Sequence, residues 1–330
     1  MPKVVRFHKT GAAEVLQIEE LPLEQPKEGE VRLRVEALGL NRAEVMFRRG
    51  AYLEPPKLPA RLGYEAAGVV DAVGPGVTSV KVGDHVSTVP SFSMNAHGVY
   101  GEWAIVPASA VARFPSNLSP QEGAAIWMQY LTAWGALVHY GGLNARQHVL
   151  ITAASSSVGL AAIELTKLAG AHPIAVTRTS AKKQFLLDFG AAEVIASTEE
   201  NLPASVRRYT GGAGADLVFD PVAGPFLETL AQSAARGGVI IEYGALSPEP
   251  TPFPLFAALA NGLTIRGYTL IEITGNAELR ARAERYIYEQ LERGKLKPKI
   301  DRVFSLSQIV EAHRYMESNQ QNGKIVVRVP

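Results

Sequence analysis

A turn of small residues joins an apolar strand to a helix in VLITAASSSVGLAAIELTKLAGA, residues 149–171. Such a turn presents backbone N–H groups and a helix N-terminus to a negatively charged group. Glycine is usual in such turns because it allows positive φ and close approach of a phosphate. Only Gly159 remains here, at the position that permits close helix–strand packing, and Ser155, Ser156 and Ser157 replace the others. Ser156, Ser157 and Val158 are candidates for binding a pyrophosphate through backbone or hydroxyl groups. The alternative is a tight turn with no ligand.

The end of the next predicted strand carries basic and hydroxyl side chains, in VTRTSAKK, residues 176–183. An NAD site usually has an acidic residue about 20 residues after the glycine turn, where it binds the ribose 2′-hydroxyl. This segment contains no acid, and cations with hydroxyls suit a 2′-phosphate, which favours NADPH. The alternative is that Ser180 caps the following helix and that the lysines are solvated. The candidate residues are Thr177, Arg178, Ser180 and Lys182.

Composition excludes several classes of protein. The chain has 330 residues, of which 47% are hydrophobic and 20% charged, as in a globular protein of two domains. The net charge is +1, so no overall field attracts nucleic acid or an anionic membrane. The absence of cysteine excludes disulfides, thiolate metal sites and cysteine nucleophiles. No apolar stretch approaches the ~18 residues of a membrane span, and no leader pattern is seen, so we expect a cytoplasmic protein.

The elements that must position these side chains fall into two patterns. Residues 1 to about 120 alternate short β-type runs with Gly/Pro turns, which predicts a compact antiparallel unit. Ser119, Pro120 and Glu122 then form a capping box, and we expect a long apolar helix that ends at Gly141 and Gly142.

Strands and helices alternate in the following segment, which predicts βαβ units with a parallel sheet. We expect helices from about 157, over 181–190, near 203–209 and near 226–235, and near-continuously apolar strands between them. A strand near 263–270 is a candidate sheet edge for pairing with a second subunit as a homodimer. An amphipathic helix over 277–294 and a final strand, KIVVRVP, that returns to the first unit complete the chain.

These features resemble the medium-chain dehydrogenase/reductase superfamily, specifically its zinc-free quinone oxidoreductase branch. The resemblance extends along the whole chain; its supporting stretches include PARLGYEAAGVVDAVGPGV, KVGDHV, GADLVFDPVAGPFLE and NGKIVV. It implies an α/β fold in which a Rossmann doubly wound parallel sheet is joined to a GroES-like β-rich catalytic domain. The implied domains are 1–123 completed by 270–330 for the catalytic domain, and 124–269 for the dinucleotide-binding domain.

The resemblance also bears on metal binding. Zinc-bearing relatives place ligands where this chain has Asn41, Tyr64 and a residue near Met128, and these side chains do not make an adequate zinc set. The four-cysteine lobe of those relatives is also missing. We therefore expect no metal, and a hydride acceptor that needs no Lewis acid, namely a quinone or an α,β-unsaturated carbonyl (enone).

By resemblance, further residues belong to the site. The set implied near nicotinamide and substrate is Asn41, Tyr52, Tyr64, Gln129 and Tyr130. The set implied near the cofactor is Asn41, Thr132, Asp220, Pro221, Val222, Tyr243, Gly244, Ala245, Asn322 and Lys324. Glu65 is a possible neighbour of the site inherited from zinc relatives.

Each of these assignments has a structural alternative. Tyr64 fits a hydrogen-bonded core tyrosine, Tyr52 surface packing, Asp220 a helix cap, and 322–324 a solvated turn. Trp127 and Trp134 are expected to be structural. The leading function is an NADPH-dependent quinone or enone reductase. The alternatives are an enoyl-thioester reductase and a nucleotide-binding protein with little catalysis, with zinc alcohol dehydrogenase last.

Overall fold

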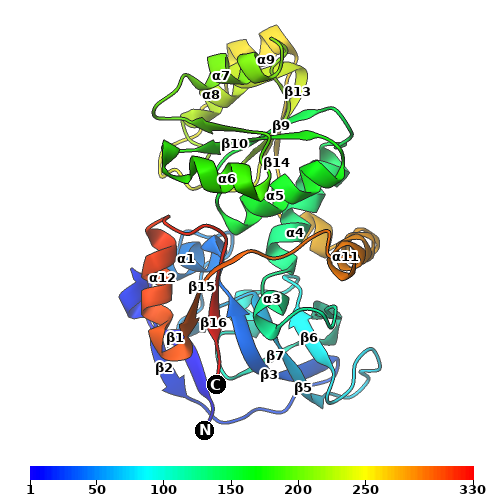
Figure 1. Cartoon of the computed structure of the whole chain (residues 1–330). Coiled ribbons are helices and arrows are strands. Elements are labelled where there is room, and N and C mark those ends of the chain that lie inside the picture. Colours follow the sequence, from blue (N-terminus) through cyan, green and yellow to red (C-terminus); the bar gives the residue numbers. More distant parts are fainter. The chain divides into compact units, whose positions relative to one another are not determined.

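A computed structural model describes residues 1–330, which form two compact units (Figure 1). One unit combines Met1–Met128 with Lys297–Pro330, and the other contains Gln129–Leu296. The boundaries inferred from resemblance, 1–123 with 270–330 and 124–269, remain a prediction of the functional domains.

The first unit is built on two sheets. The seven-stranded sheet has the order β15-β16-β3-β5-β6-β8, with β7 also paired to β3, and the three-stranded sheet has the order β2-β1-β4. All pairings are antiparallel except β15 with β16, so the sequence correctly predicts an antiparallel unit. The strands are β1 Lys3–Phe7, β2 Gln17–Glu20, β3 Glu30–Gly39, β4 Ala60–Arg61, β5 Glu65–Val73, β6 His85–Thr88, β7 Trp103–Pro107, β8 Val111–Arg113, β15 Ile300–Ser305 and β16 Lys324–Arg328.

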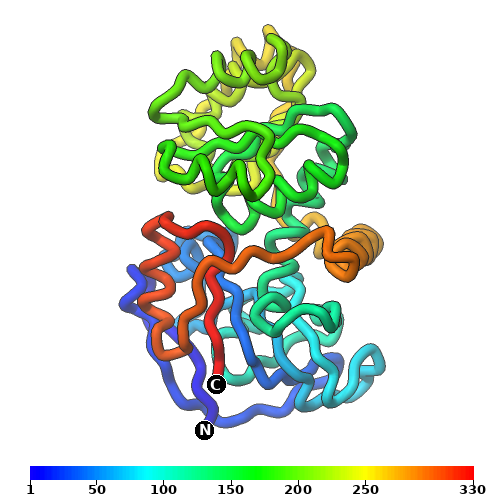
Figure 2. Tube along the Cα trace, in the orientation of Figure 1, coloured from blue at the N-terminus to red at the C-terminus, as the bar shows by residue number.

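The last strand of the chain completes this unit. β16 pairs antiparallel with β3, with Val326 opposite Gly39 and Val327 opposite Leu38. Figure 2 shows the C-terminal segment returning to the same unit as the N-terminus. The predicted return of KIVVRVP to the first unit is therefore confirmed, and it places Lys324 next to the end of β3.

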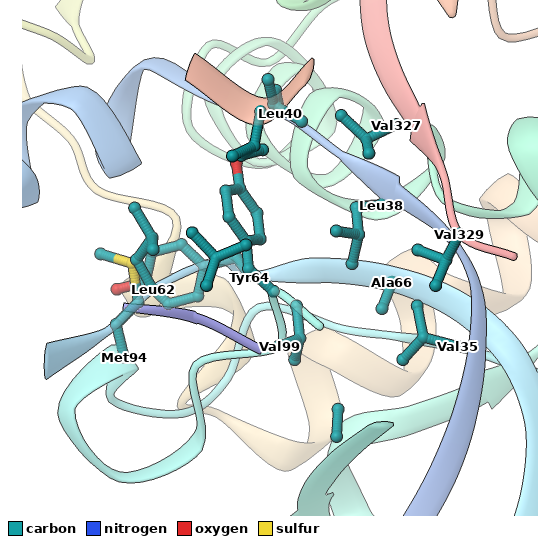
Figure 3. Packing of buried hydrophobic residues seen from close by; sticks show 14 of the residues in the cluster. Val35, Leu38, Leu40, Leu62, Tyr64, Ala66, Met94, Val99, Val327 and Val329 are labelled. Atoms are coloured by element: carbon teal, nitrogen blue, oxygen red, sulfur yellow. The ribbon is translucent and has the colours of Figure 1, made fainter. Parts of the chain in front are cut away.

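Short helices cover this unit. They are α1 Arg42–Arg49, α2 Met94–His97, α3 Pro120–Gly123 and α12 Ile309–Glu317, with 3₁₀ turns at Ala13–Val15, Ala108–Ala110 and Leu306–Gln308. The buried core includes alternate residues of β3, such as Val31, Leu33 and Val35. Figure 3 shows Tyr64 within this cluster, near Leu62 and Val99.

The second unit contains one six-stranded sheet. Its order is β11-β10-β9-β12-β13-β14 and every pairing is parallel, as the alternation in the sequence predicts. This is the order of a Rossmann sheet, in which the chain reverses direction across the sheet between β9 and β12. The strands are β9 His148–Ile151, β10 His172–Thr177, β11 Glu193–Ala196, β12 Ala215–Asp220, β13 Ala234–Glu242 and β14 Thr264–Gly267.

Helices cover both faces of this sheet, which explains its near-continuously apolar strands. Figure 1 shows α5 and α6 on one side and α7, α8 and α9 on the other. The helices of the unit are α4 Trp127–Ala133, which begins two residues before the unit boundary, α5 Ser157–Leu168, α6 Lys183–Phe189, α7 Leu202–Tyr209, α8 Phe226–Ser233, α9 Leu255–Asn261, α10 Ile271–Thr274 and α11 Ala277–Glu292, with a 3₁₀ turn at Ser180–Lys182. No helix in the chain has both the length and the apolar character needed to cross a bilayer.

Two helix predictions differ from the structure in continuity or bounds, although the predicted helix end at Gly141 is confirmed. The capping box of Ser119, Pro120 and Glu122 forms, but it starts a helix of one turn, and α4 begins separately at Trp127. From Trp134 to Tyr140 the hydrogen bonding then widens to a π-helix, which a side-chain pattern does not reveal. The helix expected near 226–235 ends at Ser233 because Ala234 already pairs with Ala215 as the start of β13.

Candidate functional site

The serine turn begins α5 and leaves polar groups at its N-terminus. Ser156 is the N-cap residue, and its hydroxyl accepts a hydrogen bond of 3.1 Å from the N–H of Gly159. Ala153 has a φ of 44°, so an alanine rather than a glycine adopts the left-handed conformation in this turn. Such a conformation in a residue with a Cβ is costly and concentrates at functional sites. The turn therefore begins α5 with a capped N-terminus, although it lacks most of the usual glycines.

Gly159 is required by close packing. A Cβ on this residue would lie 2.7 Å from both the Cα and the carbonyl oxygen of Ala154. The predicted role of Gly159 in close helix–strand packing is confirmed.

The basic end of β10 lies beside the serine turn. The ammonium of Lys182 donates to the hydroxyl of Ser155 over 3.1 Å. Arg178 is exposed and forms no ion pair. Ser180 does not cap the following helix, because Thr179 is the N-cap residue of that turn and makes no side-chain cap bond. The cationic side chain of Lys182 thus lies beside the turn that begins α5.

One acidic residue near this end was missed in the sequence. Glu199 accepts a hydrogen bond of 3.0 Å from the N–H of Ser180. It comes from the loop after β11, a strand parallel to β10, and nothing in the local pattern near 176–183 indicates it. Its carboxylate places a negative charge at the turn that begins with Ser180.

The ends of β12 and β13 form the next part of the site. Asp220 is fully buried; its carboxylate accepts hydrogen bonds from the hydroxyl of Thr152 and, over 2.6 Å, from the N–H of Ala223. The N-cap residue of α8 is Pro225, so the helix-cap alternative for Asp220 is wrong. The Asp220 side chain instead fixes the turn after β12, in which Ala223 has a φ of 57°.

The loops after these two strands are hydrogen-bonded to each other. The N–H groups of Leu246 and Ser247 donate to the carbonyls of Pro221 and Val222, both over 2.9 Å. A Cβ on Gly244 would lie 2.9 Å from Pro221, so glycine is needed there. Predicted residues 220–222 and 243–245 therefore do lie together. A shallow pocket of about 400 Å³ lies beside them; it is lined by Val222, Ala223, Pro225, Phe226, Thr229, Ser247 and Glu249.

Tyr243 connects the strand ends to the serine turn. Its ring stacks on Phe219 with centroids 4.0 Å apart. Burial raises the pKa of its hydroxyl, the charge of Asp220 adds to this effect, and the neighbouring Ser156 hydroxyl opposes it. The turn after β9 and the ends of β12 and β13 thus form one continuous surface at the carboxyl edge of the sheet, where open α/β sheets bind ligands.

In the first unit, Asn41, Glu65 and Lys324 form a buried polar cluster. The ammonium of Lys324 donates to Asn41 Oδ1 over 2.6 Å and to Glu65. The amide of Asn41 donates to Glu65 over 3.1 Å, and the N–H of Met128 donates to the other oxygen of Glu65 over 2.9 Å. Lys324 is 1% exposed, so the solvated-turn alternative is wrong for this residue.

Glu44 joins this cluster and was also missed. It is fully buried, and its carboxylate accepts from the backbone and side-chain N–H groups of Asn41 and from the N–H of Tyr64. Burial raises the pKa of Glu44 to about 7, although Lys324 and these hydrogen bonds act to lower it. The capping-box spacing of Asn41 and Glu44 was the signal available in the sequence.

Tyr52 and Tyr64 lie close together beside this cluster. Their rings meet at an angle of 60° with centroids 6.4 Å apart, and Tyr64 also contacts Phe92. Tyr64 is 5% exposed and belongs to the hydrophobic core, which agrees with its structural alternative. Tyr52 is partly buried against the same core rather than packed on the surface.

The remaining predicted residues are buried on α4. Gln129 is 2% exposed and its Oε1 has no hydrogen-bond partner, and Thr132 is also buried. The Tyr130 hydroxyl donates to Glu164 over 2.7 Å. Trp127 donates to Ser87 over 2.8 Å and Trp134 is 1% exposed, as expected of structural tryptophans.

No group of three or more histidine, aspartate or glutamate side chains in the chain is arranged to hold a metal ion. The predicted residues fall into two sets, one in each unit. Asn41, Tyr52, Tyr64 and Lys324 gather in the first, with Asn322 two residues before Lys324. The turn after β9, the end of β10 and the ends of β12 and β13 gather in the second.

Comparison with known proteins gives matches along nearly the whole chain. The family model described as "Alcohol dehydrogenase GroES-like domain" matches residues 27–116, and the one described as "Zinc-binding dehydrogenase" matches residues 157–285. Quinone oxidoreductase of Homo sapiens is 30% identical over 332 residues, covering 98% of this chain and 97% of the relative.

Two solved structures are also similar over the full length. The quinone oxidoreductase of Escherichia coli in complex with NADPH has a TM-score of 0.91 and 29% identity, covering 99% of both chains. A structure described as an NAD-dependent alcohol dehydrogenase has a TM-score of 0.92 and 34% identity, covering 99% of this chain and 100% of its own. The fold predicted from the sequence is confirmed.

The buried cluster gives a testable prediction about stability. Lys324→Met should lower the free energy of unfolding by about 3 to 5 kcal/mol, because Glu65 would remain buried without its cation. Adding Glu65→Gln should recover part of this loss, since the unpaired charge is removed. Urea unfolding measures both effects, with the exposed Lys9→Met as the control. A single variant as stable as the control, or a double variant no more stable than the single, would contradict the role given to this ion pair.

Proposed function

Because the chain belongs to the zinc-free quinone oxidoreductase branch of the medium-chain dehydrogenase/reductase superfamily, we propose that it reduces a quinone or an α,β-unsaturated carbonyl with NADPH. The single observation that carries the choice of cofactor is the cationic end of β10 beside the serine turn. Arg178 there has no acidic partner, and Lys182 lies against Ser155.

The residues of the second unit fit a dinucleotide. Ser156, Ser157 and Val158 stand at the N-terminus of α5, where N–H groups and the helix dipole suit a pyrophosphate. Arg178 and Lys182, with Thr177 and Ser180, would hold the 2′-phosphate. The negative charge of Glu199 would repel the 2′-phosphate, but one oxygen of this carboxylate already accepts a hydrogen bond from the N–H of Ser180. The strand ends at 220–222 and 243–245 would contact the nicotinamide, and Asn41, Thr132, Asn322 and Lys324 are proposed as further cofactor contacts.

The choice of acceptor follows from the donors available in the chain. Bound NADPH supplies a hydride when it reacts. A simple ketone accepts hydride readily only when its oxygen is strongly polarised, which zinc does in the zinc-bearing relatives. Zinc-bearing relatives place ligands where this chain has Asn41 and Tyr64 and at a position near Met128, and the side chains of Asn41 and Tyr64 are an amide and a phenol. A conjugated acceptor places the negative charge on an oxygen that hydrogen bonds from such groups can stabilise.

The proposed roles in catalysis follow from hydrogen-bonding capacity. The side chains of Tyr52, Tyr64, Asn41 and Gln129 carry N–H or O–H groups that can donate to an anionic oxygen. The proposed donor Tyr130 would have to give up its hydrogen bond to Glu164 to do the same. Burial raises the pKa of both Tyr52 and Tyr64, so these phenols keep their protons at neutral pH and remain donors. Gln129 Oε1 is buried without a hydrogen-bond partner, so a ligand that donates a hydrogen bond would satisfy it.

We also propose that the protein is a homodimer in the cytosol. β14 is an edge strand with unpaired backbone groups. The preceding helix α9 and its entry loop expose Phe253, Leu255, Phe256 and Leu259, of which Phe256 is 84% exposed. A second copy would cover both features at once through a two-fold axis.

Arg178→Ala tests the cofactor choice. The KM for NADPH should rise about tenfold or more, because a hydrogen bond to a charged group contributes about 1.5 kcal/mol or more. The KM for NADH should stay nearly unchanged. Steady-state kinetics with both cofactors measures this difference, and Arg236→Ala, also exposed on the same unit, is the control. An equal rise for both cofactors would mean that Arg178 does not bind the phosphate.

A substrate panel tests the reaction. Oxidation of NADPH should be fast with quinones and enones and slow with simple ketones, and reduction of NADP⁺ by secondary alcohols should also be slow. The rates with quinones and enones should be unchanged after incubation with a zinc chelator. Loss of turnover with the chelator would refute the metal-free proposal. Turnover of enoyl-thioesters alone would favour that reductase class, and tight NADPH binding without turnover of any acceptor would favour a binding protein.

Phe256→Asp tests the dimer. Sedimentation equilibrium should show a dimer for the unmodified protein and a monomer for this variant, because a charge is introduced into the buried apolar contact. Val82→Asp, which also changes an exposed apolar residue but in the first unit, should remain dimeric. A monomeric unmodified protein would exclude the proposal.

A further inference from the structure

Two carboxyl groups end neighbouring strands side by side. Asp220 is the last residue of β12 and Glu242 the last residue of β13, and the register of these parallel strands places them directly opposite each other. Side chains opposite each other on paired strands point to the same face of the sheet. Like charges in this arrangement repel, so this register would be costly with both groups ionised.

The surroundings of the pair do not offset this repulsion. Asp220 has hydrogen bonds from Thr152 and from the N–H of Ala223. Both oxygens of Glu242 are buried, and no N–H or O–H group of the chain donates to either of them. A proton on Glu242 would supply the missing donor, and Asp220 is the acceptor that faces it.

The other charged and titratable groups near the pair do not change this balance. Tyr243, next to Glu242 on β13, has its pKa raised by burial and stays neutral. From β14 and its following loop, Arg266 is paired with Glu272 and lies over the ring of Tyr140, while Tyr268 contributes only its N–H to the Glu242 carbonyl. β9 contributes the uncharged Thr152. No cation therefore forms an ion pair with either carboxylate.

The titration behaviour agrees with this geometry. Burial raises the pKa of Glu242 to about 9, and the neighbouring charge of Asp220 contributes in the same direction. Burial also raises the pKa of Asp220, while the hydrogen bonds from Thr152 and Ala223 oppose that change. Two carboxyls that share a site behave in this way, and one of them stays protonated at neutral pH.

We propose that Asp220 and Glu242 hold one proton between them in the resting protein and release it when a positively charged nicotinamide ring occupies the ends of β12 and β13. The proposal rests on the proposed function, because it takes the nicotinamide to lie at residues 220–222 and 243–245. It adds Glu242, which no sequence pattern had placed in the site, as a residue that senses the redox state of the cofactor.

The charges and electrons balance as follows. The reduced ring is neutral, and loss of a hydride to the acceptor leaves a ring with one positive charge. The Asp220–Glu242 pair then loses its proton to solvent, and its charge changes from −1 to −2. The second negative charge of the pair stabilises the positive charge of the oxidised ring. By linkage, the oxidised cofactor binds more tightly as the pH rises, up to the pKa of the pair in the free protein.

The first experiment needs no cofactor. Carboxyl carbons of the ¹³C-labelled protein should include one that titrates near pH 9, and Glu242→Gln should abolish this signal. Because the pKa of Glu242 is raised in the folded state, the folded protein keeps a proton on this residue that the unfolded chain loses above about pH 4.5. The melting temperature of the unmodified protein should therefore fall more between pH 5 and 9 than that of Glu242→Gln, whose amide is a permanent donor to Asp220.

The second experiment compares the two redox states of the cofactor. Dissociation constants of NADP⁺ and NADPH are measured by calorimetry between pH 6 and 9, in buffers with different ionisation enthalpies. NADP⁺ binding should release up to one proton more than NADPH binding, and the ratio of the two constants should change by up to tenfold per pH unit. Because both cofactors carry the same 2′-phosphate, its titration affects both dissociation constants equally and cancels in their ratio. Glu242→Gln should remove this pH dependence, whereas Glu289→Gln, which changes an exposed carboxylate on α11 of the same unit, should keep it.

The outcomes separate this inference from the proposed function. Equal proton release for both cofactors would overturn the inference and leave NADPH binding intact. Absence of a carboxyl that titrates near pH 9 would overturn it without any reference to a cofactor. Failure of both dinucleotides to bind would overturn the proposed function and with it the coupling, even where the apo protein shows the shared proton.

Discussion

The parallel alignment of the second unit's strands is the constraint on which the candidate site depends. Because β9, β10, β12 and β13 run in one direction, their carboxyl ends share one edge of the sheet. Segments more than 60 residues apart in sequence, such as Thr152 and Asp220, therefore become hydrogen-bonded neighbours. The same alignment brings Lys182 to the serine turn and places Asp220 opposite Glu242. The parallel strands therefore produce both the cationic end of β10 and the repulsion between the two carboxyls.

The first unit depends on a different interaction, the buried ion pair of Glu65 and Lys324, whose residues are far apart in the sequence. Burial of Glu65 and Lys324 removes two charges from water, and this is tolerated only because each finds the other together with the amide of Asn41. Tyr64 precedes Glu65, and Glu44 binds the N–H of Tyr64. The polar cluster thus fixes the backbone from which the candidate tyrosine extends, and the apolar packing around Tyr64 fixes its ring.

The sequence predicted what depends on short-range pattern. Strand and helix alternation gave the parallel sheet, and the capping residues gave the start of α3 and α5. The missed residues reach the site through other elements: Glu199 from the loop after β11 and Glu242 through strand register. An acid that directly ends an apolar strand, in both VFD and IIE, was the available signal for the carboxyl pair. The left-handed Ala153 and the π-helical turn leave no mark in residue type.

The position of β16 has a consequence for biosynthesis. The strand occupies Lys324–Arg328, five residues from which the chain completes a sheet begun near its N-terminus. These residues are synthesised after every strand of the second unit. Until then β3 lacks its pairing with β16 and Glu65 lacks its cation, so the first unit cannot complete its sheet before the strands of the second unit have been made.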